Sequence, residues 1–233
     1  MDAAAIASTP SFVERTTQLL ERIDYRRADT PEERDAICRQ RYDAYLRENT
    51  ITPNFSRRIT DKYDDSSWMF GLFIDNKLSS SLRVSVATKQ KPELPALQVF
   101  AEYVTPMLQA GKTVVDPTRF VADLESTRMY PQIAWLTARL GWVAGEYFNA
   151  DIILSCCRAE HRAFYTRVWG FRPVCEPRSY PTLTKGISLM MIDYPAVRDW
   201  VHRRYPFFRS TAFERRMLFE RGDAVAQRTA TAA

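Results

Sequence analysis

The 233-residue sequence contains no long hydrophobic run. No stretch approaches the roughly 20 uninterrupted apolar residues that a membrane-spanning helix needs. The first ten residues also lack the basic-then-apolar order of a secretory signal. We therefore expect a cytoplasmic protein without a transmembrane segment.

Cysteine and histidine are scarce, and their spacing is not that of a metal centre. The two histidines are His161 and His202, and there is no CxxC pair. The four cysteines all lie in apolar or strand-like segments: Cys38, Cys156, Cys157 and Cys175. We expect four buried reduced thiols, no disulfide framework and no metal site.

The remaining composition is that of one large globular domain, with 45% hydrophobic and 26% charged residues. The formal net charge is +5, and arginine supplies most of the positive charge. This excess fits either a solvated surface or an acidic partner. A non-catalytic nucleic-acid-binding protein is a further alternative, but the basic residues are spread out and no recognised nucleic-acid motif appears. We expect no nucleic-acid partner.

Helix-starting residues stand out in the N-terminal half. Ser11 and Glu14 form a capping box, and Thr30 followed by Pro31 is a second helix start. Residues 47–66 are polar and irregular. The predicted elements are a short helix from residue 12, a strand around 23–28 and a helix from 31 to about 46.

Two strand-like runs follow, at 68–74 and 78–87, joined by Asp75-Asn76. Asp and Asn tolerate the left-handed conformation of a tight hairpin turn, so we expect antiparallel pairing. In the second run one apolar face alternates with a face that presents Arg83 among small hydroxyl residues. A solvent-facing arginine is the simpler interpretation of Arg83, and a functional one is the alternative.

A helix near 99–109 precedes a strand over 113–121 that Pro117 interrupts. Because proline removes a ladder donor, it fits a bulge or an edge. A bulge can direct Asp116 and Arg119 to the same side, where a regular strand would oppose them.

The second half reads as a strand, helix, strand crossover, which indicates an α/β fold with parallel strands. The predicted elements are helices from 131 to 149 and from 160 to 169, and strands at 152–157, from 171, and at 186–193. The stretch 199–221 mixes aromatic residues with arginines. We expect a structural helix packed on the sheet there, with a membrane-surface or partner helix as the alternative.

This order of elements is similar to that of GNAT-like acyltransferases, and three local patterns sharpen the likeness. They are the acidic loop Asp61-Lys62-Tyr63-Asp64, the strand arginine Arg83, and the bulged-strand segment Asp116-Pro117-Thr118-Arg119-Phe120. Together they resemble the acyl-homoserine lactone synthases, whose pattern has D-x-Y-D, a strand arginine and E-x-S-R-F in the same order. The likeness is closer to the long-chain N-acyl amino acid synthases, which share that fold and take acyl chains from acyl carrier protein.

The resemblance implies an α/β fold of the GNAT-like (acyl-CoA N-acyltransferase) type, with a mixed central sheet and splayed parallel strands flanked by helices. It covers roughly residues 23–195. We accordingly divide the chain into an N-terminal extension and helix (1–22), a GNAT-like acyltransferase domain (23–195), a C-terminal helical extension (196–221) and a disordered tail (222–233).

Two departures bear on the substrates. Ile59 stands where the autoinducer enzymes carry another acid, and Asp116 replaces their glutamate, which favours an amino acid over S-adenosylmethionine as acceptor. CoA-dependent GNAT enzymes hold pyrophosphate on a glycine-rich loop at a helix N-terminus. The corresponding stretch here, 121–131, has no glycine, which favours the acyl-phosphopantetheine of acyl carrier protein, lying near Phe120 and Ile153, as donor.

The resemblance and the needs of acyl transfer together suggest roles for seven residues. Asp116 would orient or deprotonate the amine, with no covalent enzyme intermediate and no permanently bound cofactor. The catalytic residues are Asp116 and Arg119; the substrate-binding residues are Arg83, Asp61, Asp64 and Phe120; the candidate acid for the leaving group is Tyr165.

Three alternatives to these roles stay open. The charged residues could form a purely structural ion-pair network, and Tyr165 could be a packed core tyrosine. The enzyme could instead be an acyl-homoserine lactone synthase or a CoA-dependent N-acetyltransferase. Aromatic and apolar residues that could line an acyl tunnel, or simply form the core, are Leu140, Trp142, Phe148, Phe164 and Trp169.

Overall fold

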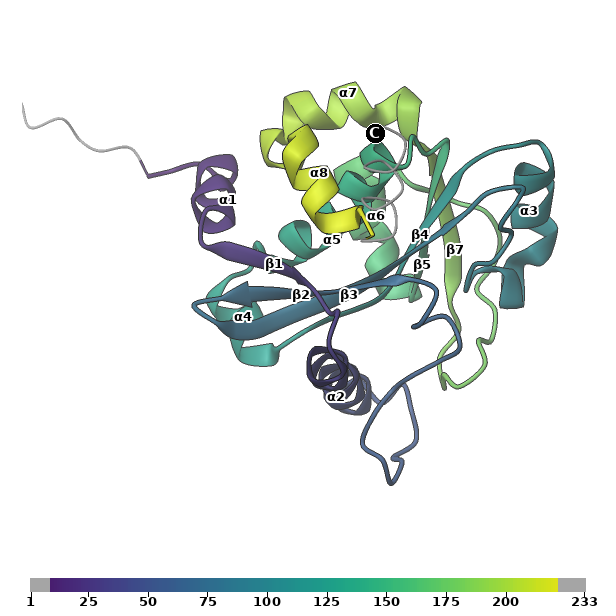
Figure 1. Cartoon of the computed structure of the whole chain (residues 1–233), viewed down its shortest axis with the longest axis horizontal. Coiled ribbons are helices and arrows are strands. Elements are labelled where there is room, and N and C mark those ends of the chain that lie inside the picture. Colours follow the sequence, from purple (N-terminus) through teal and green to yellow (C-terminus); the bar gives the residue numbers. More distant parts are fainter. Residues whose placement is uncertain (1–8, 222–233) are drawn as a thin grey trace, which may run out of the picture.

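The computed structural model describes residues 9–221, so the predicted disordered tail lies outside the described residues. One seven-stranded sheet has the order β1-β2-β3-β4-β5-β7-β6, and only β4 and β5 run parallel (Figure 1). The strands are β1 Ile23–Arg27, β2 Trp68–Ile74, β3 Lys77–Ala87, β4 Val114–Ala122, β5 Ile152–Cys157, β6 Arg172–Pro173 and β7 Ser188–Asp193.

Helices cover both faces of this sheet (Figure 1). The helices are α1 Phe12–Leu20, α2 Pro31–Arg47, α3 Leu97–Gln109, α4 Leu124–Met129, α5 Ile133–Tyr147, α6 Arg162–Trp169, α7 Tyr194–Arg204 and α8 Ala212–Phe219, with short 3₁₀ turns η1 Ala159–His161 and η2 Pro206–Phe208. The main core packs α5 and the C-terminal helices on one face, whereas α2 and α3 pack on the other.

Local sequence signals set the starts of α1 and α2 and the β2–β3 turn. Both predicted capping boxes are present, Ser11 with Glu14 and Thr30 with Glu33. Asp75 and Asn76 both have positive φ, +50° and +63°, as a two-residue hairpin turn requires. The predicted antiparallel hairpin is confirmed.

Of the two alternatives at Pro117, a bulge or an edge, β4 has a bulge, which lies just after Pro117. Ser81 pairs with Val121 and Arg83 with Thr118, so β4 carries one more residue than β3 in this interval. Arg119 lies in the bulge with φ +57°, a conformation that non-glycine residues seldom adopt. The extra residue changes which face of the sheet each following side chain occupies.

The parallel strands separate soon after they meet. β4 and β5 pair only at Val114 with Ile152 and at Val115 with Ile153. Beyond these positions no ladder joins the two strands, and α5 passes close to the opening. A methyl group on Gly141 of α5 would come 2.5 Å from Cγ of Pro117, so glycine permits this approach.

The structure differs from the sequence prediction at three places. Helix α4 was not predicted, because six residues are too few to show a helical period. The strand from residue 171 has only two residues. The C-terminal stretch forms two helices and a 3₁₀ turn, and Pro206 begins the turn.

All four cysteines are free thiols, two of them buried and two partly buried. Within residues 9–221, no helix is long and apolar enough to cross a membrane.

Candidate active site

The acidic loop and two strand arginines meet in a buried ion-pair cluster. Arg83 Nη1 lies 3.0 Å from Asp64 Oδ1 and also hydrogen-bonds Asp61 Oδ1. Arg119 Nη2 contacts Asp61 Oδ2 at 2.7 Å, and Arg83 Nε donates to Thr118 Oγ1 at 3.1 Å. The side chains of Arg83 and Arg119 are only 1% and 8% exposed, so water screens these charges little. The structure therefore brings these four predicted charged residues together.

The loop itself is shaped by its aspartates. The backbone N–H of Asp61 donates to Asp64 Oδ2 at 3.0 Å, and that of Tyr63 donates to Asp61 Oδ1 at 2.9 Å. Burial alone would raise the pKa of Asp61, but the ion pairs with Arg83 and Arg119 outweigh it and hold this pKa at about 2. The D-x-Y-D spacing thus presents a fixed negative charge to the arginines.

Arg41 completes the cluster, and sequence reasoning missed it. Its side chain is fully buried, and Nη1 lies 2.8 Å from Asp64 Oδ1. Nε and Nη2 of Arg41 are buried and have no hydrogen-bond partner within the described residues. Arg41 lies inside α2 at i+3 from Cys38, on the buried side of the helix. This spacing could have marked it as inward-facing, but arginine is seldom fully buried unless it is paired.

Asp116 lies near the cluster but forms no ion pair with any described residue. Its side chain is fully buried, and Oδ2 accepts a hydrogen bond from Ala96 N at 3.1 Å, while Oδ1 has no partner within residues 9–221. Burial raises the pKa of Asp116 to about 6, although the Ala96 N–H and the charge of Arg83 act to lower it. Asp116 is therefore a carboxyl group that titrates near neutral pH and has one free oxygen.

A pocket opens beside this cluster, on the face of the sheet that also carries α2 and α3. Its empty space is about 360 Å³, part of it open to solvent. Its charged groups are Arg83 and Arg119, and phenol rings stand beside them. The pocket is lined by Tyr45, Arg83, Pro95, Ala96, Thr118, Arg119, Cys156, Tyr180, Leu183 and Ile187. We call it the polar pocket.

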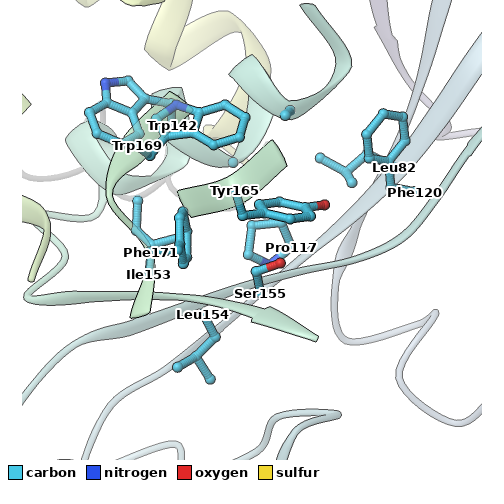
Figure 2. A pocket seen from close by; sticks show the side chains of 12 residues that line it. Leu82, Pro117, Phe120, Trp142, Ile153, Leu154, Ser155, Tyr165, Trp169 and Phe171 are labelled. Atoms are coloured by element: carbon cyan, nitrogen blue, oxygen red, sulfur yellow. The ribbon is translucent and has the colours of Figure 1, made fainter. Parts of the chain in front are cut away.

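A second pocket, which we call the apolar slot, lies between the separated strands and α5 and α6. Its empty space is about 400 Å³, also partly open to solvent. Figure 2 shows its aromatic rings gathered around the strand opening. It is lined by Leu82, Pro117, Phe120, Ala138, Gly141, Trp142, Ile153, Leu154, Ser155, Tyr165, Trp169 and Phe171.

The β4 bulge distributes neighbouring side chains between the two pockets. Pro117 and Phe120 line the apolar slot, while Thr118 and Arg119 line the polar pocket. On β5, Ser155 faces the slot and Cys156 faces the polar pocket. The two pockets therefore lie on opposite sides of one opening in the sheet.

The predicted tunnel residues divide into two groups. Trp142 and Trp169 line the apolar slot, but Leu140, Phe148 and Phe164 do not. Leu140 is fully buried core, and Phe148 and Phe164 pack against other aromatic rings. For these three residues the alternative of plain core packing holds, because helical spacing identifies an inward face, not which part of that face meets an empty space.

A family model described as N-acyl amino acid synthase FeeM matches residues 36–193. The chain belongs to this family. The matched region contains the acidic loop, both strand arginines and every residue that lines the two pockets. The resemblance inferred from three short motifs is therefore confirmed, and the chain is an N-acyltransferase.

Solved structures agree with this membership of the FeeM N-acyl amino acid synthase family. FeeM, an N-acyl amino acid synthase from uncultured soil microbes, is similar with a TM-score of 0.64 and 21% identity, covering 76% of this chain and 94% of that chain. Two CoA-dependent acyl-homoserine lactone synthases, BjaI and MesI, each match with a TM-score of 0.52. Their identities are 13% and 17%, over 79% and 82% of this chain and 89% and 97% of theirs.

At these identities the structural likeness shows the fold, which is the predicted GNAT-like α/β fold. A search of curated proteins finds no match. Helices α1, α7 and α8 lie outside the segment that matches the FeeM family model.

Proposed function

We propose that this member of the FeeM N-acyl amino acid synthase family transfers a long acyl chain from the phosphopantetheine thioester of acyl carrier protein to the amino group of an amino acid. The observation that carries the proposal is an apolar slot and a polar pocket with two buried arginine side chains, on opposite sides of one opening in the sheet. An acyl chain fits the first, and a zwitterion fits the second.

The charges of the cluster favour an acceptor that carries a carboxylate. Within the described residues, the three arginines Arg41, Arg83 and Arg119 are opposed in this cluster by two aspartates, Asp61 and Asp64. Asp116, the other carboxyl group near the cluster, forms no ion pair with any described residue, so two carboxylates share three guanidinium groups. Because Arg83 and Arg119 also line the polar pocket, the carboxylate of an amino acid would bind to them there.

Asp116 is the complementary group for the amine. With a pKa of about 6, it is mostly ionised at pH 7. Its carboxyl group does not line the polar pocket but is buried behind Ala96, which does. Its free oxygen can therefore accept a proton from the acceptor's ammonium group only when the pocket wall at Ala96 shifts on acceptor binding. The neutral amine then attacks the thioester carbonyl, forming the C–N bond. Collapse of the tetrahedral intermediate breaks the C–S bond, the nitrogen loses its second proton, and the thiolate takes up a proton. The products are an amide, a free thiol and one proton released to solvent.

Tyr165 is the candidate proton donor to the departing thiolate. Its side chain lines the slot, and Figure 2 shows its hydroxyl group and that of Ser155 in the same part of the slot. Burial raises the pKa of Tyr165 above its usual value of 10, although Ser155 acts to lower it. The phenol therefore stays protonated at neutral pH, as a proton donor must.

The segment after β4 favours a carrier-protein arm over CoA. In CoA-dependent enzymes of this fold, free backbone N–H groups at a helix start bind the pyrophosphate. Here Asp123 caps α4, accepting from Ser126 N at 2.9 Å and Ser126 Oγ at 2.8 Å, and its carboxylate pairs with Lys77 at 3.2 Å. The carboxylate of Asp123 already accepts the hydrogen bond at the start of α4, and its negative charge would repel a pyrophosphate there.

A substrate panel tests the proposal. The purified protein is incubated with long-chain acyl thioesters of acyl carrier protein and of CoA, with acetyl-CoA, and with single amino acids or S-adenosylmethionine as acceptor. We expect mass spectrometry to identify N-acyl amino acids, formed faster from the carrier-protein donor. A homoserine lactone product, or turnover with acetyl-CoA alone, would refute it.

A pair of variants tests the acceptor pocket. Arg83→Ala removes the central cation of the cluster, so KM for the amino acid should rise or turnover should vanish. Arg26→Ala on β1, whose side chain is 38% exposed, is the matched control and should leave both unchanged. If Arg83→Ala leaves turnover and KM unaltered, the ion-pair cluster has only a structural role.

A further inference from the structure

The C-terminal cap, defined here as α7, η2 and α8 over residues 194–219, carries an unusual share of exposed apolar side chains. Six large hydrophobic side chains are exposed in the described part of the chain, and three belong to the cap. These are Trp200, Phe213 and Met217, with exposed fractions of 40%, 66% and 65%. Single exposed apolar residues are common, but a group confined to one short segment indicates an interaction surface.

The cap also holds most of the chain's excess positive charge. Its six arginines face two carboxylates, Asp199 and Glu214, an excess of four, whereas the whole chain has a formal net charge of +5. Glu214 is already bound to Arg139 in the core, Arg198 pairs with Asp199, and Arg215 pairs with Glu146. Four cap arginines form no ion pair with any described residue: Arg203, Arg204, Arg209 and Arg216.

Apolar and cationic side chains occur together on the exposed side of each cap helix, which we call the outer face of the cap. On α8, Phe213, Arg216 and Met217 lie at i, i+3 and i+4, whereas the opposite face buries Leu218 and Phe219. On α7, the guanidinium of Arg204 lies 6.0 Å from the centre of the exposed Trp200 ring. Both helices form an outer layer above α5, on the side away from α2 (Figure 1).

We propose that this outer face of the cap docks the protein on the surface of an anionic lipid bilayer. Arginine beside exposed aromatic and aliphatic side chains matches the two parts of such a surface, the negative headgroups and the boundary of the acyl chains. Tryptophan, moreover, is enriched at this interface because its ring is apolar and its N–H is polar. Charge complementarity thus selects an anionic membrane as the occupant.

The cap is also in direct contact with the wall of the apolar slot. Trp142, which lines the slot, donates from Nε1 to His202 Nε2 of α7 at 3.0 Å, and its ring packs on Phe208 of η2. A bilayer at the outer face of the cap would be separated from this wall by the cap helices alone, so an amphiphilic product would form close to the membrane. This advantage rests on the proposed function, but the binding itself does not.

Vesicle co-sedimentation of the full-length chain tests the inference without any activity readout. The vesicles are phosphatidylcholine alone or phosphatidylcholine mixed with phosphatidylglycerol, at low and high salt. We expect binding to the mixed vesicles that weakens with salt. Arg209→Gln with Arg216→Gln should weaken it roughly 25-fold, at about fivefold per arginine, and Phe213→Ser with Met217→Ser should reduce it strongly.

The control replaces two exposed apolar residues outside the cap, Leu124→Ser with Met129→Ser on α4, and should bind like the unmodified protein. Equal binding to both kinds of vesicle, no binding, or binding unchanged by the cap variants overturns the proposal. So does a dimer, seen by analytical ultracentrifugation, that Phe213→Ser with Met217→Ser dissociates, because the face would then be an interface between copies of the chain.

Discussion

Replacing Asp116 with Asn should lower activity and yet increase stability at high pH. Burial moves the pKa of Asp116 from its ordinary value of 3.8 to about 6 in the folded protein. An acid whose pKa is raised by folding binds its proton more tightly in the folded than in the unfolded protein. This contribution to the stability of the native state is fully present below pH 3.8 and is lost as pH rises through 6. At pH 8 the ionised carboxylate therefore costs the native state about 3 kcal/mol. Asn keeps the acceptor for Ala96 N and removes that cost.

Denaturant unfolding at two pH values measures this effect. The stability of Asp116→Asn relative to the unmodified chain should rise by about 2 kcal/mol between pH 4.5 and pH 8, since about a third of the cost is already present at pH 4.5. Comparing two pH values cancels any constant penalty from the new amide. In the unmodified enzyme kcat/KM should rise with pH through about 6, and in the variant it should fall by about 100- to 10,000-fold.

Two results would refute this reasoning. A stability difference that is the same at both pH values would mean that Asp116 titrates normally, and thus that its carboxylate reaches water. A variant that keeps full activity would mean that another group takes the amine proton. Circular dichroism spectra of the variant and the unmodified chain at each pH show whether both are folded, and so separate these two outcomes from misfolding.

Two further variants test the cluster and the strand opening. Arg41→Met removes one counterion of Asp64 inside the core and should destabilise the fold by about 3 kcal/mol in urea unfolding; a loss below about 1 kcal/mol would contradict a buried pair. Gly141→Ala places a methyl group 2.5 Å from Pro117 Cγ, so it should cost about 1–3 kcal/mol and slow turnover of long-chain donors more than of short ones. Equal slowing for donors of all chain lengths would mean that the strand opening at Gly141 does not affect binding of the acyl chain in the apolar slot.

Much of the local structure could be predicted because it depends on residues that are close in sequence. The capping boxes at Ser11 and Thr30, the Asp75-Asn76 turn and the bulge just after Pro117 each involve side chains within a few residues of their effect. The order of these elements, with the three motifs, was sufficient to identify the family. Helix α4 was missed because its only strong signal is the cap at Asp123.

Sequence reasoning singled out the charged residues that meet in the cluster, except Arg41, but not their electrostatics. The sequence indicated that a bulge can direct Asp116 and Arg119 to one side of the strand, and it left open whether the loop aspartates and strand arginines form an ion-pair network. It could not distinguish Asp61, whose pKa is held low by two arginines, from Asp116, whose pKa is raised by burial. Both are aspartates in short polar motifs, and only their neighbours in space separate them.

The sequence by itself determined most element types, their order and the family, because these follow from periodicity, turn chemistry and motif spacing along the chain. The tertiary structure alone decided that Arg41 joins the ion-pair cluster, that β4 and β5 part after two paired positions, and that Trp142 faces the slot while Phe148 does not. Burial, charge pairing and empty space arise between segments that are distant in sequence, so no local pattern of residues encodes them.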